Sequence, residues 1–548
     1  MRKNNSADRK VYFVIFTRVA SLLFLFLFSA HELSAQILPK EWSKLHYRII
    51  GFSYPLNDVV VKYKIEIAAG NFSNEDSFKK NIIKSVYSKS NKVIAEVPYF
   101  GVDYTWQAVY TLKKSVIKKS NLYHFSTLYT PEIDSCNVRL RIIKPAVKYR
   151  DNYVFVDGNN ALYDMKGNPV WYFPFPGKEE QGNVLARDLK TTPQGTITFL
   201  HTQHIFEINY NGDTLWKGPD NGQVSGGDSE RYHHEFTRLA NGHYMVLGTE
   251  HVHWDHPFIP EDSSFSMIED EKIKYDSNIS AKKKTPFGTL IEYDEKGNVV
   301  WSWKSSKYFM GSDLLYYRPE GKVKVIDVHE NAFYFDEHEC AIYISFRNIS
   351  RVLKISYPEG NVMNTYGEIF RPSVPAIGNG MFCAQHACRK SKEGYLYLYN
   401  NNACNDDKSL PTVIMMKESP SGNDSLIKIW EYECSIDGIN LNPLTRKARE
   451  KRAMMVRKKM NDKSWKATLL HYTSGGNVIE LPDRSLFVCM NAQYSKLFIV
   501  SHDKKILWSA TPEKLNPGNN EWYISSQLYK ASIITRKQLE RLIWNTAK

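Results

Sequence analysis

Several short motifs that would assign a chemistry directly are absent from the 548 residues. The chain has no GxxxxGK[ST] phosphate-binding loop, no HExxH zinc-protease motif and no GxSxG nucleophile elbow. Its seven cysteines include no CxxC pair with metal-ligand spacing. Beyond residue 35, no stretch approaches the roughly 18 apolar residues of a membrane helix. A P-loop nucleotide site is therefore unsupported, and the mature chain is expected to have no membrane span.

The first 35 residues have the features of a secretory signal. Basic residues between Arg2 and Arg18 precede the apolar run Ala20–Ala30, and Leu33-Ser34-Ala35 suits cleavage. An uncleaved anchor is the alternative. An exported chain permits disulfides, and the odd cysteine count leaves at least one thiol free. A bridge among Cys383, Cys388 and Cys404 could brace the hairpin between them, but the pairing cannot be read from the sequence.

The chain is basic, and the charge is spread along it. Removal of residues 1–35 lowers the formal net charge from +13 to about +10. One run, 446–466, contains ten Lys or Arg residues and is expected to be helical. It is interpreted as a solvated inserted helix or, alternatively, as an attractor of anionic substrates. Nucleic acid is a poor partner for an exported protein.

The mature chain divides into two parts by pattern. Residues 36–145 contain alternating segments such as Val59–Ile67, Lys92–Val97 and Trp106–Leu112, which predict an antiparallel β-sandwich. From about residue 146 to 548, a unit of strand, polar turn and strand ending in an aromatic residue recurs about six times. Tryptophans mark five of the copies: 171, 216, 301, 430 and 508.

The recurring hairpins predict an all-β fold, a six-bladed β-propeller. Uneven spacing indicates insertions at 251–285, 311–325 and 435–470. The C-terminal YKASII segment could close the ring by completing the first blade, and RKQLERLIW could be a terminal helix.

Polar residues recur at matched positions of the repeats. Eight residues before each inner turn stand Arg187, His234, His329, His386 and, roughly, Gly476. The strands after these turns end at His201, Glu250, Arg347, Asn400 and Asn491. Because the innermost strands of a propeller line its channel, these side chains are expected to converge. An array of Arg and His suits a tetrahedral anion, and a neutral imidazole is also a nucleophile. His233 could be the inward residue instead of His234.

These motifs together resemble the bacterial arylsulfate sulfotransferases. The resemblance rests on HH-E near a turn (His233–Glu235), HEN followed by S-x-R (His329–Arg347), and QH before a hairpin (Gln385-His386). It covers nearly all of the mature chain. It implies a periplasmic six-bladed propeller with an N-terminal β-sandwich, and makes a homodimer plausible.

The resemblance also implies a reaction and assigns roles by position. A sulfuryl group would move from a phenolic sulfate ester to a phenol without 3′-phosphoadenylyl sulfate and without a cofactor. His386 would be the nucleophile and form a transient sulfohistidine. His234, His329 and Arg347 would hold the sulfuryl oxygens and stabilise the leaving phenolate. The expected substrate-binding residues are Asn331, His233 and Arg187.

The chain departs from the family pattern at three places. Glu235 stands where the family usually has Asp, Ala387 and Cys388 separate His386 from Arg389, and Asn400-Asn401-Asn402 replaces Asp-Asn-Gly. These departures bear on rate and substrate range more than on the reaction class.

Three other interpretations stay open. His251, His253 and His256 could bind a metal, but their spacing is not that of a recognised zinc motif, and no metal site is expected. The protein could be a propeller enzyme of another class, such as a polysaccharide lyase or a quinone-dependent dehydrogenase. It could also be a binding module for sulfated or glycan ligands that forms no covalent species.

Overall fold

The structure is a computed structural model. It describes residues 37–55, 60–129, 137–174, 186–253, 284–309, 315–317, 323–325, 328–367, 381–402, 410–420, 425–434, 475–491, 495–516, 518–525 and 528–545. The predicted signal peptide and the basic run 446–466 lie outside these residues, as do most or all of the three predicted insertions.

The prediction of an all-β fold is confirmed. The described residues contain two α-helices, α2 (Glu75–Lys80) and the predicted terminal helix α4 (Arg536–Asn545), and otherwise form strands and connections. Neither helix has the length and apolar character needed to cross a membrane. The chain divides into two compact units, one ending at Tyr129 and one beginning at Thr130.

The first unit is built from two sheets. The larger has the order β1-β8-β6-β3-β4, with β7 on β6, and the smaller pairs β2 with β5. The strands are β1 (Ser43–Leu45), β2 (Ile49–Ser53), β3 (Val60–Ala69), β4 (Ile82–Ser88), β5 (Lys92–Glu96), β6 (Asp103–Leu112), β7 (Ile117–Lys119) and β8 (Tyr123–Thr127). Phe52 and Trp106 are fully buried and meet edge to face across the two sheets, with ring centroids 5.2 Å apart.

The second unit contains six sheets, each based on four antiparallel strands. Sheet 1 has β10 (Tyr153–Val156), β11 (Ala161–Asp164), β12 (Pro169–Tyr172) and β36 (Ala531–Ile534). Sheet 2 has β13 (Ala186–Thr191), β14 (Ile197–His201), β15 (His204–Ile208) and β16 (Thr214–Lys217). Sheet 3 has β17 (Tyr232–Arg238), β18 (Tyr244–His253), β19 (Lys284–Tyr293) and β20 (Val299–Lys304).

The other three sheets follow the same plan. Sheet 4 has β23 (Glu330–Asp336), β24 (Ala341–Phe346), β25 (Arg351–Ser356) and β26 (Val362–Gly367). Sheet 5 has β27 (His386–Lys390), β28 (Leu396–Asn400), β29 (Thr412–Glu418) and β30 (Leu426–Glu433). Sheet 6 has β31 (Asn477–Glu480), β32 (Leu486–Met490), β33 (Lys496–Val500) and β34 (Ile506–Leu515), extended by β35 (Trp522–Ile524) and β9 (Val138–Lys144). A small hairpin, β21 (Leu315–Tyr317) with β22 (Val323–Val325), stands apart.

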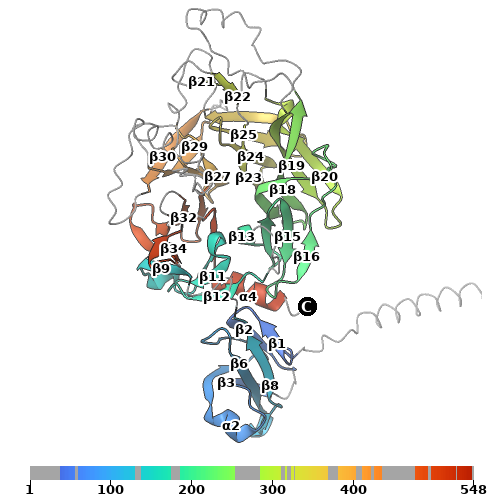
Figure 1. Cartoon of the computed structure of the whole chain (residues 1–548), viewed down its shortest axis with the longest axis vertical. Coiled ribbons are helices and arrows are strands. Elements are labelled where there is room, and N and C mark those ends of the chain that lie inside the picture. The colour runs from blue at the N-terminus through green and yellow to red at the C-terminus, as the bar shows by residue number, and fades with distance from the viewer. Residues whose placement is uncertain are drawn as a thin grey trace, which may run out of the picture. The chain divides into compact units, whose positions relative to one another are not determined.

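The six sheets are arranged around a common centre (Figure 1). One edge strand of each sheet faces that centre. These inner strands follow the order β36, β13, β17, β23, β27 and β31. Each contacts the next, and β31 contacts β36, so the ring is closed. The last strand, β36, pairs with β10 near the start of the unit, as predicted from the YKASII segment. The C-terminal segment therefore completes the first sheet.

The recurring tryptophans connect neighbouring sheets. Trp171 of sheet 1 donates a hydrogen bond through Nε1 to the Tyr210 carbonyl in the β15–β16 turn of sheet 2, at 3.0 Å. Trp301, Trp430 and Trp508 do the same toward the next sheet around the ring, and Trp508 reaches back to the Met165 carbonyl of sheet 1. Burying a tryptophan is favourable when its N–H finds an acceptor, which explains why this residue recurs at the end of the repeat.

The expected boundary at Pro145 differs from the division at Tyr129 and Thr130. The strand between these positions, β9, pairs along its length with β34 of sheet 6. Its alternation resembles that of the preceding strands, so the sequence pattern did not distinguish which unit it joins.

Candidate active site

The strands that face the centre of the second unit begin with irregular pairing. The ladders of β13, β17, β23 and β27 each contain a register shift near their first residues. Asp188, His234 and Ala387 lie within three of these shifts and have positive φ angles of 56°, 60° and 54°. Bulges of this kind re-aim neighbouring side chains, and non-glycine residues rarely adopt such φ values. Consecutive polar residues are thereby brought toward one centre.

The prediction that His234, His329 and His386 occupy equivalent positions in their strands is wrong, because they lie at different positions relative to the bulges. His386 pairs with Tyr399 before its bulge, as Arg187 pairs with Leu200. His234 lies inside the bulge of β17, where His233 takes the paired position instead. His329 precedes β23 and has a φ of 55°. The bulges therefore give each histidine a different local geometry.

His386 is almost fully buried at the start of β27. Its Nδ1 is 2.6 Å from Oδ1 of Asn401, and Nδ2 of Asn401 donates to the Gly475 carbonyl at 2.9 Å. Because the Asn401 amide donates through Nδ2, its Oδ1 is the acceptor and Nδ1 of His386 carries the proton. Nε2 of His386 then holds a lone pair, which accepts the Gly475 N–H at 3.2 Å.

The surroundings of His386 keep the imidazole neutral. Burial, reinforced by the charge of Arg347, lowers the pKa of His386 well below its ordinary value, although the hydrogen bond that His386 donates to Asn401 opposes this. A neutral imidazole with a lone pair on Nε2 is the nucleophilic form of histidine.

His233 and His234 form a hydrogen-bonded pair on β17. Their Nδ1 atoms are 2.7 Å apart, and Nε2 of His233 is 3.0 Å from the Gly248 carbonyl. A carbonyl only accepts, so Nε2 of His233 donates to it; when His233 is neutral, Nδ1 of His234 donates to Nδ1 of His233. Burial, followed by the neighbouring imidazoles, lowers the pKa of His234 well below its ordinary value. His234 therefore presents Nε2 as a base.

His329 and Arg347 are joined through the main chain. The Arg347 N–H donates to the His329 carbonyl at 2.9 Å, and the rings of His329 and His234 meet edge to face at 5.0 Å. Burial and then the Arg347 charge lower the pKa of His329 to about 4. The Arg347 guanidinium donates to Asn348 at 3.0 Å and forms no ion pair with an acidic side chain within the described part of the chain. Its charge is thus available to an anion.

Asn331 and Gln385 hold the chain on either side of the histidines. Nδ2 of the fully buried Asn331 donates to the Gln385 carbonyl at 2.6 Å, next to His386. Nε2 of Gln385 lies within hydrogen-bond distance of Ser345 and of the carbonyls of Phe346 and Arg351. Asn331 therefore fixes the backbone that carries His386, and Gln385 is a structural neighbour.

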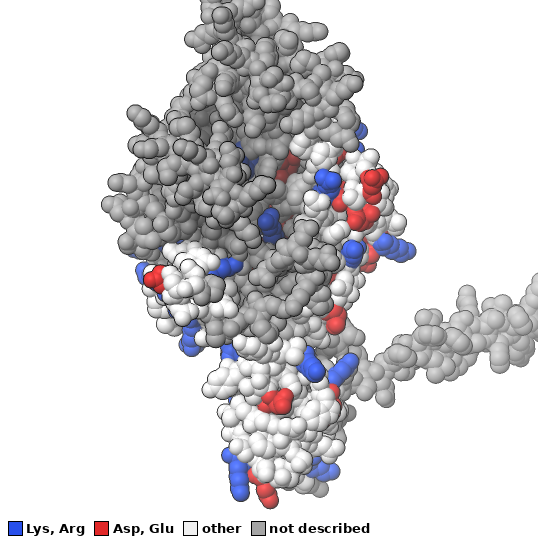
Figure 2. Space-filling view, viewed as in Figure 1, with Lys and Arg blue, Asp and Glu red and all other residues white. Residues whose placement is uncertain are grey.

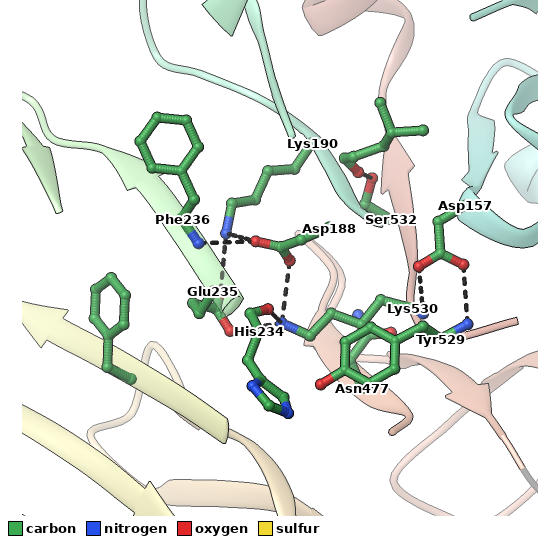
Figure 3. Close-up of polar contacts among 12 residues, drawn as sticks. Asp157, Asp188, Lys190, His234, Glu235, Phe236, Asn477, Tyr529, Lys530 and Ser532 are labelled. Carbon is green, nitrogen blue, oxygen red and sulfur yellow. Dashed lines mark hydrogen bonds and ion pairs between the residues drawn. The ribbon is translucent and has the colours of Figure 1, made fainter. Parts of the chain in front are cut away.

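Arg187 and Tyr529 lie beside the histidines. The Arg187 guanidinium lies 5.4 Å from the Tyr529 ring centroid. That ring is 5.8 Å from the ring of His234 and 6.4 Å from that of His386. The Tyr529 hydroxyl is buried without a hydrogen-bond partner among the residues described, and it points toward His234 (Figure 3). The seven predicted site residues thus belong to one connected neighbourhood, and Lys or Arg side chains lie in the hollow of this unit (Figure 2).

A buried ionic cluster adjoins His234. Glu235 contacts Arg389 at 2.5 Å, Lys190 at 2.8 Å and Lys530 at 2.8 Å. Asp188 contacts Lys190 at 2.8 Å and Lys530 at 3.1 Å. Burial alone would raise the pKa of Glu235, but its cationic partners outweigh this and hold the pKa well below the ordinary value. The carboxylate after the histidine pair therefore holds cations and not an imidazole.

Sequence reasoning missed four residues of this site: Asn401, Gly475, Tyr529 and Lys530. Gly475 has a φ of 83°, and a Cβ on it would lie 2.7 Å from the Tyr529 ring, so only glycine fits. The adjacent glycines at 475 and 476 were the available signal. Tyr529 and Lys530 lie far from the histidines in sequence, and no local pattern marks them.

No metal site emerges from the residues that the structure describes, where no three His, Cys, Asp or Glu side chains group suitably. Of the HVHWDH segment, the side chains of His253 and His256 lie outside the description. Cys388 is a free thiol, which excludes a disulfide from it, and Cys136 and Cys404 lie outside the described residues.

The fold and site together define an all-β protein whose histidines and arginines meet at the centre of a ring of sheets. The sequence model of the family Arylsulfotransferase (ASST) matches residues 147–278 and 249–422, together just over half of the chain. The chain belongs to the arylsulfotransferase family, and this membership supports arylsulfotransferase activity in general. The matched segments include His234, His329, Arg347 and His386.

Comparisons with other proteins add little to this assignment. No curated protein sequence gives a significant match. Among solved structures, a protein of unknown function from Bacteroides caccae is 11% identical, covering 70% of this chain and 98% of its own, with a TM-score of 0.37. An auxiliary nutrient binding protein from Bacteroides thetaiotaomicron is 11% identical, covering 92% and 95%, with a TM-score of 0.32. These likenesses are too weak to assign a fold or an activity.

Proposed function

We propose that the six sheets of the second unit are the blades of a six-bladed β-propeller whose axis carries the active site. The closed order of inner strands and the tryptophan contacts between successive sheets support this. We also propose that the first unit, which ends at Tyr129, acts as a separate β-sandwich domain and that the signal-like N-terminus exports the protein to the periplasm, where a homodimer is plausible.

We infer that the protein transfers sulfuryl groups between phenols through His386. Nε2 of His386 attacks the sulfur of an aryl sulfate, the N–S bond forms, and the S–O bond to the aryl group breaks. The electron pair of that bond leaves with the phenolate oxygen. The observation that carries this proposal is the neutral His386 imidazole with Nδ1–H bound to Asn401 and the lone pair on Nε2.

In the second half of the reaction, the sulfuryl group moves from His386 to a different phenol, the acceptor. The acceptor oxygen attacks sulfur, the S–O bond forms, the N–S bond breaks, and its electron pair returns to Nε2. The acceptor proton passes to a base, for which His234 has the suitable neutral form. His234 then releases that proton to the departed phenolate or to solvent, and the protein returns to its starting state without a cofactor or 3′-phosphoadenylyl sulfate.

The other site residues stabilise the charge that moves during transfer. Arg347 offers a cationic fork to the sulfuryl oxygens, and His329 lies beside it. When Nε2 takes the sulfuryl group, the Gly475 N–H loses its acceptor and can donate to a sulfuryl oxygen. We assign Arg187 to the approach of the anionic donor, His233 to the orientation of His234, and Asn331 to the backbone of His386.

Steady-state kinetics test this function. Initial rates are measured with 4-nitrophenyl sulfate as donor and phenol as acceptor, with both concentrations varied. Transfer through a covalent intermediate predicts parallel double-reciprocal lines, and His386→Ala is expected to release no nitrophenolate above background. Intersecting lines, or a His386→Ala variant that keeps wild-type turnover, would contradict the proposal. Ligand binding without turnover across several aryl donors would favour a binding module.

A further inference from the structure

The segment that closes the ring, Tyr529–Ala531, is held through its main chain. The N–H groups of Tyr529 and Lys530 donate to the buried Asp157 carboxylate at 3.0 and 2.8 Å. The Asn477 side chain accepts from the Ala531 N–H at 3.1 Å and donates to its carbonyl at 2.8 Å. This segment therefore bridges sheet 1 and sheet 6 at the start of β36 (Figure 3).

The Lys530 side chain continues from this segment into the candidate active site. Its Nζ contacts Glu235 at 2.8 Å and Asp188 at 3.1 Å. It also donates to the main-chain carbonyl of His234 at 2.7 Å. An ammonium group has three N–H donors, and the three acceptors use all of them. The segment that closes the ring thus contacts the main chain of His234, whose backbone has a left-handed conformation.

Lys530 stays charged in this position. Burial would lower its pKa, but Asp188 and Glu235 raise it above the ordinary value. The side chain is 5% exposed, so its charge acts on neighbours with little screening by water. The positive charge of Lys530 is also among the influences that lower the pKa of both His234 and His386.

The cluster around Lys530 joins the strands that carry the site. Asp188 and Lys190 come from β13, Glu235 from β17 and Arg389 from β27, the strand that begins at His386. Lys530 comes from the closing segment, and it alone of the three cations contacts both carboxylates and the His234 carbonyl. Lys190 also contacts both carboxylates, but it does not bind the His234 main chain.

We propose that Lys530 is a positioning residue for sulfuryl transfer: it fixes the His234 main chain and places a buried positive charge beside the site imidazoles, so that the active site is complete only when the C-terminal segment closes the ring. This inference rests on the proposed sulfotransferase function. Because its three N–H donors are taken by protein acceptors, we assign Lys530 no contact with the substrate. Its effect is therefore expected on kcat and on the pH profile more than on donor KM.

Three variants of the full-length protein test this inference. Lys530→Met removes the charge, Lys530→Arg keeps the charge with a different shape, and Ser532→Ala is the matched control. Ser532 lies on the same closing strand and donates to the Leu189 carbonyl at 2.6 Å, away from the histidines. The readouts are kcat, donor KM and the pH dependence of kcat/KM with 4-nitrophenyl sulfate, together with circular dichroism and thermal unfolding.

Lys530→Met is expected to lower kcat by about 10- to 100-fold with donor KM within about twofold. Its acidic limb should move to higher pH, because loss of a nearby positive charge raises the imidazole pKa values. Lys530→Arg should restore the position of that limb, and Ser532→Ala should match the wild type. A folded Lys530→Met variant with wild-type kcat and pH profile, or an equal loss in Ser532→Ala, would overturn the inference.

Two further outcomes remain decisive. If Lys530→Met does not fold, Lys530→Arg carries the test: reduced kcat with an unmoved acidic limb supports the inference, and wild-type kcat contradicts it. If the wild type transfers no sulfuryl group, the proposed function fails. NMR titration of ¹⁵N-labelled histidines in folded wild type and Lys530→Met then decides the role of Lys530. Higher imidazole pKa values in the variant support it, and unchanged values overturn it.

Discussion

At the scale of single residues, Asn401 sets the chemical form of His386. Its amide donates to the Gly475 carbonyl and accepts from the imidazole, so one side chain fixes both the nucleophile and the glycine whose N–H reaches Nε2. A carboxylate in this place would accept the same proton but would favour the imidazolium. The asparagine therefore suits a histidine that must be neutral.

The substitution Asn401→Asp tests this directly. A carboxylate beside Nδ1–H should raise the pKa of His386, so the acidic limb of kcat/KM should move to higher pH. Asn401→Ala, which removes the acceptor without adding charge, should lower kcat without that movement of the limb. The measurement is kcat/KM for an aryl sulfate between pH 5 and 9. An unmoved limb in folded Asn401→Asp would contradict the role given to Asn401.

The wild-type pH profile follows from the lowered histidine pKa values. An ordinary histidine would be about three-quarters protonated at pH 6. His386 and His234 have pKa values well below ordinary, and His329 has one of about 4, so these imidazoles stay neutral there. We expect kcat/KM to stay nearly constant from pH 8 to 6 and to fall only in more acidic solution. A half-maximal point near pH 6.5 due to His386 would contradict this account.

At the scale of elements, the bulges of the inner strands decide which side chains meet. The bulge of β17 gives His234 its positive φ and points Glu235 into the ionic cluster. That carboxylate binds Arg389, 154 residues later in the chain. The inner strands are thus held together by buried charges as well as by packing.

Removal of one member of this cluster should be costly. Glu235→Gln leaves three cations with the single carboxylate of Asp188, and we expect the free energy of unfolding to fall by about 3–5 kcal/mol. Glu295→Gln is the matched control, because Glu295 is 65% exposed and pairs with Arg238 at the surface; it should cost less than about 1 kcal/mol. Urea unfolding followed by tryptophan fluorescence measures both. Equal, small losses would show that the cluster contributes little.

The hairpins were predictable from the sequence because their signals are local. Asp164 and Asp294 accept hydrogen bonds from N–H groups two and four residues later, which is why an Asp with a Gly three residues after it recurs at these turns. The bulges and the ionic cluster were not predictable, because each depends on the pairing of distant strands. The sequence consequently indicated which histidines would converge but not their individual geometry.

At the scale of the whole molecule, the C-terminal strand β36 completes the first sheet of the second unit. The C-terminal strand was predicted to join the first sheet, since that sheet otherwise lacks its inner strand. The sequence did not reveal that Asp157 holds this junction by accepting two main-chain N–H groups. Burial raises the pKa of Asp157 to about 7. Ring closure should therefore respond to pH.

The direction of this pH dependence of stability follows from the raised pKa of Asp157. Because the folded-state pKa of Asp157 lies above that of an unfolded carboxyl group, the folded state binds the extra proton between about pH 7 and 4. The stability of the wild type relative to Asp157→Asn should therefore increase as pH falls from 8 to 5. Thermal unfolding of both proteins across this range measures the difference. A difference that is constant, or that decreases toward pH 5, would contradict the assignment.

Asp483→Asn serves as the control for this series. Lys148 and other partners of Asp483 outweigh its burial and lower its pKa to about 2. Its contribution is present above the unfolded pKa and lost only as the pH falls toward 2. The stability difference between wild type and Asp483→Asn should thus stay flat between pH 8 and 5.

Intact-protein mass spectrometry tests the central claim most directly. Wild type, His386→Ala and His243→Ala, a histidine outside the site, are each mixed with 4-nitrophenyl sulfate without an acceptor, at mildly alkaline pH to protect the N–S bond. The account predicts the added mass of one sulfuryl group on the wild type and on His243→Ala, located to the peptide containing His386, and none on His386→Ala. An adduct that persists in His386→Ala, or turnover by a wild type that never carries the group, would contradict it.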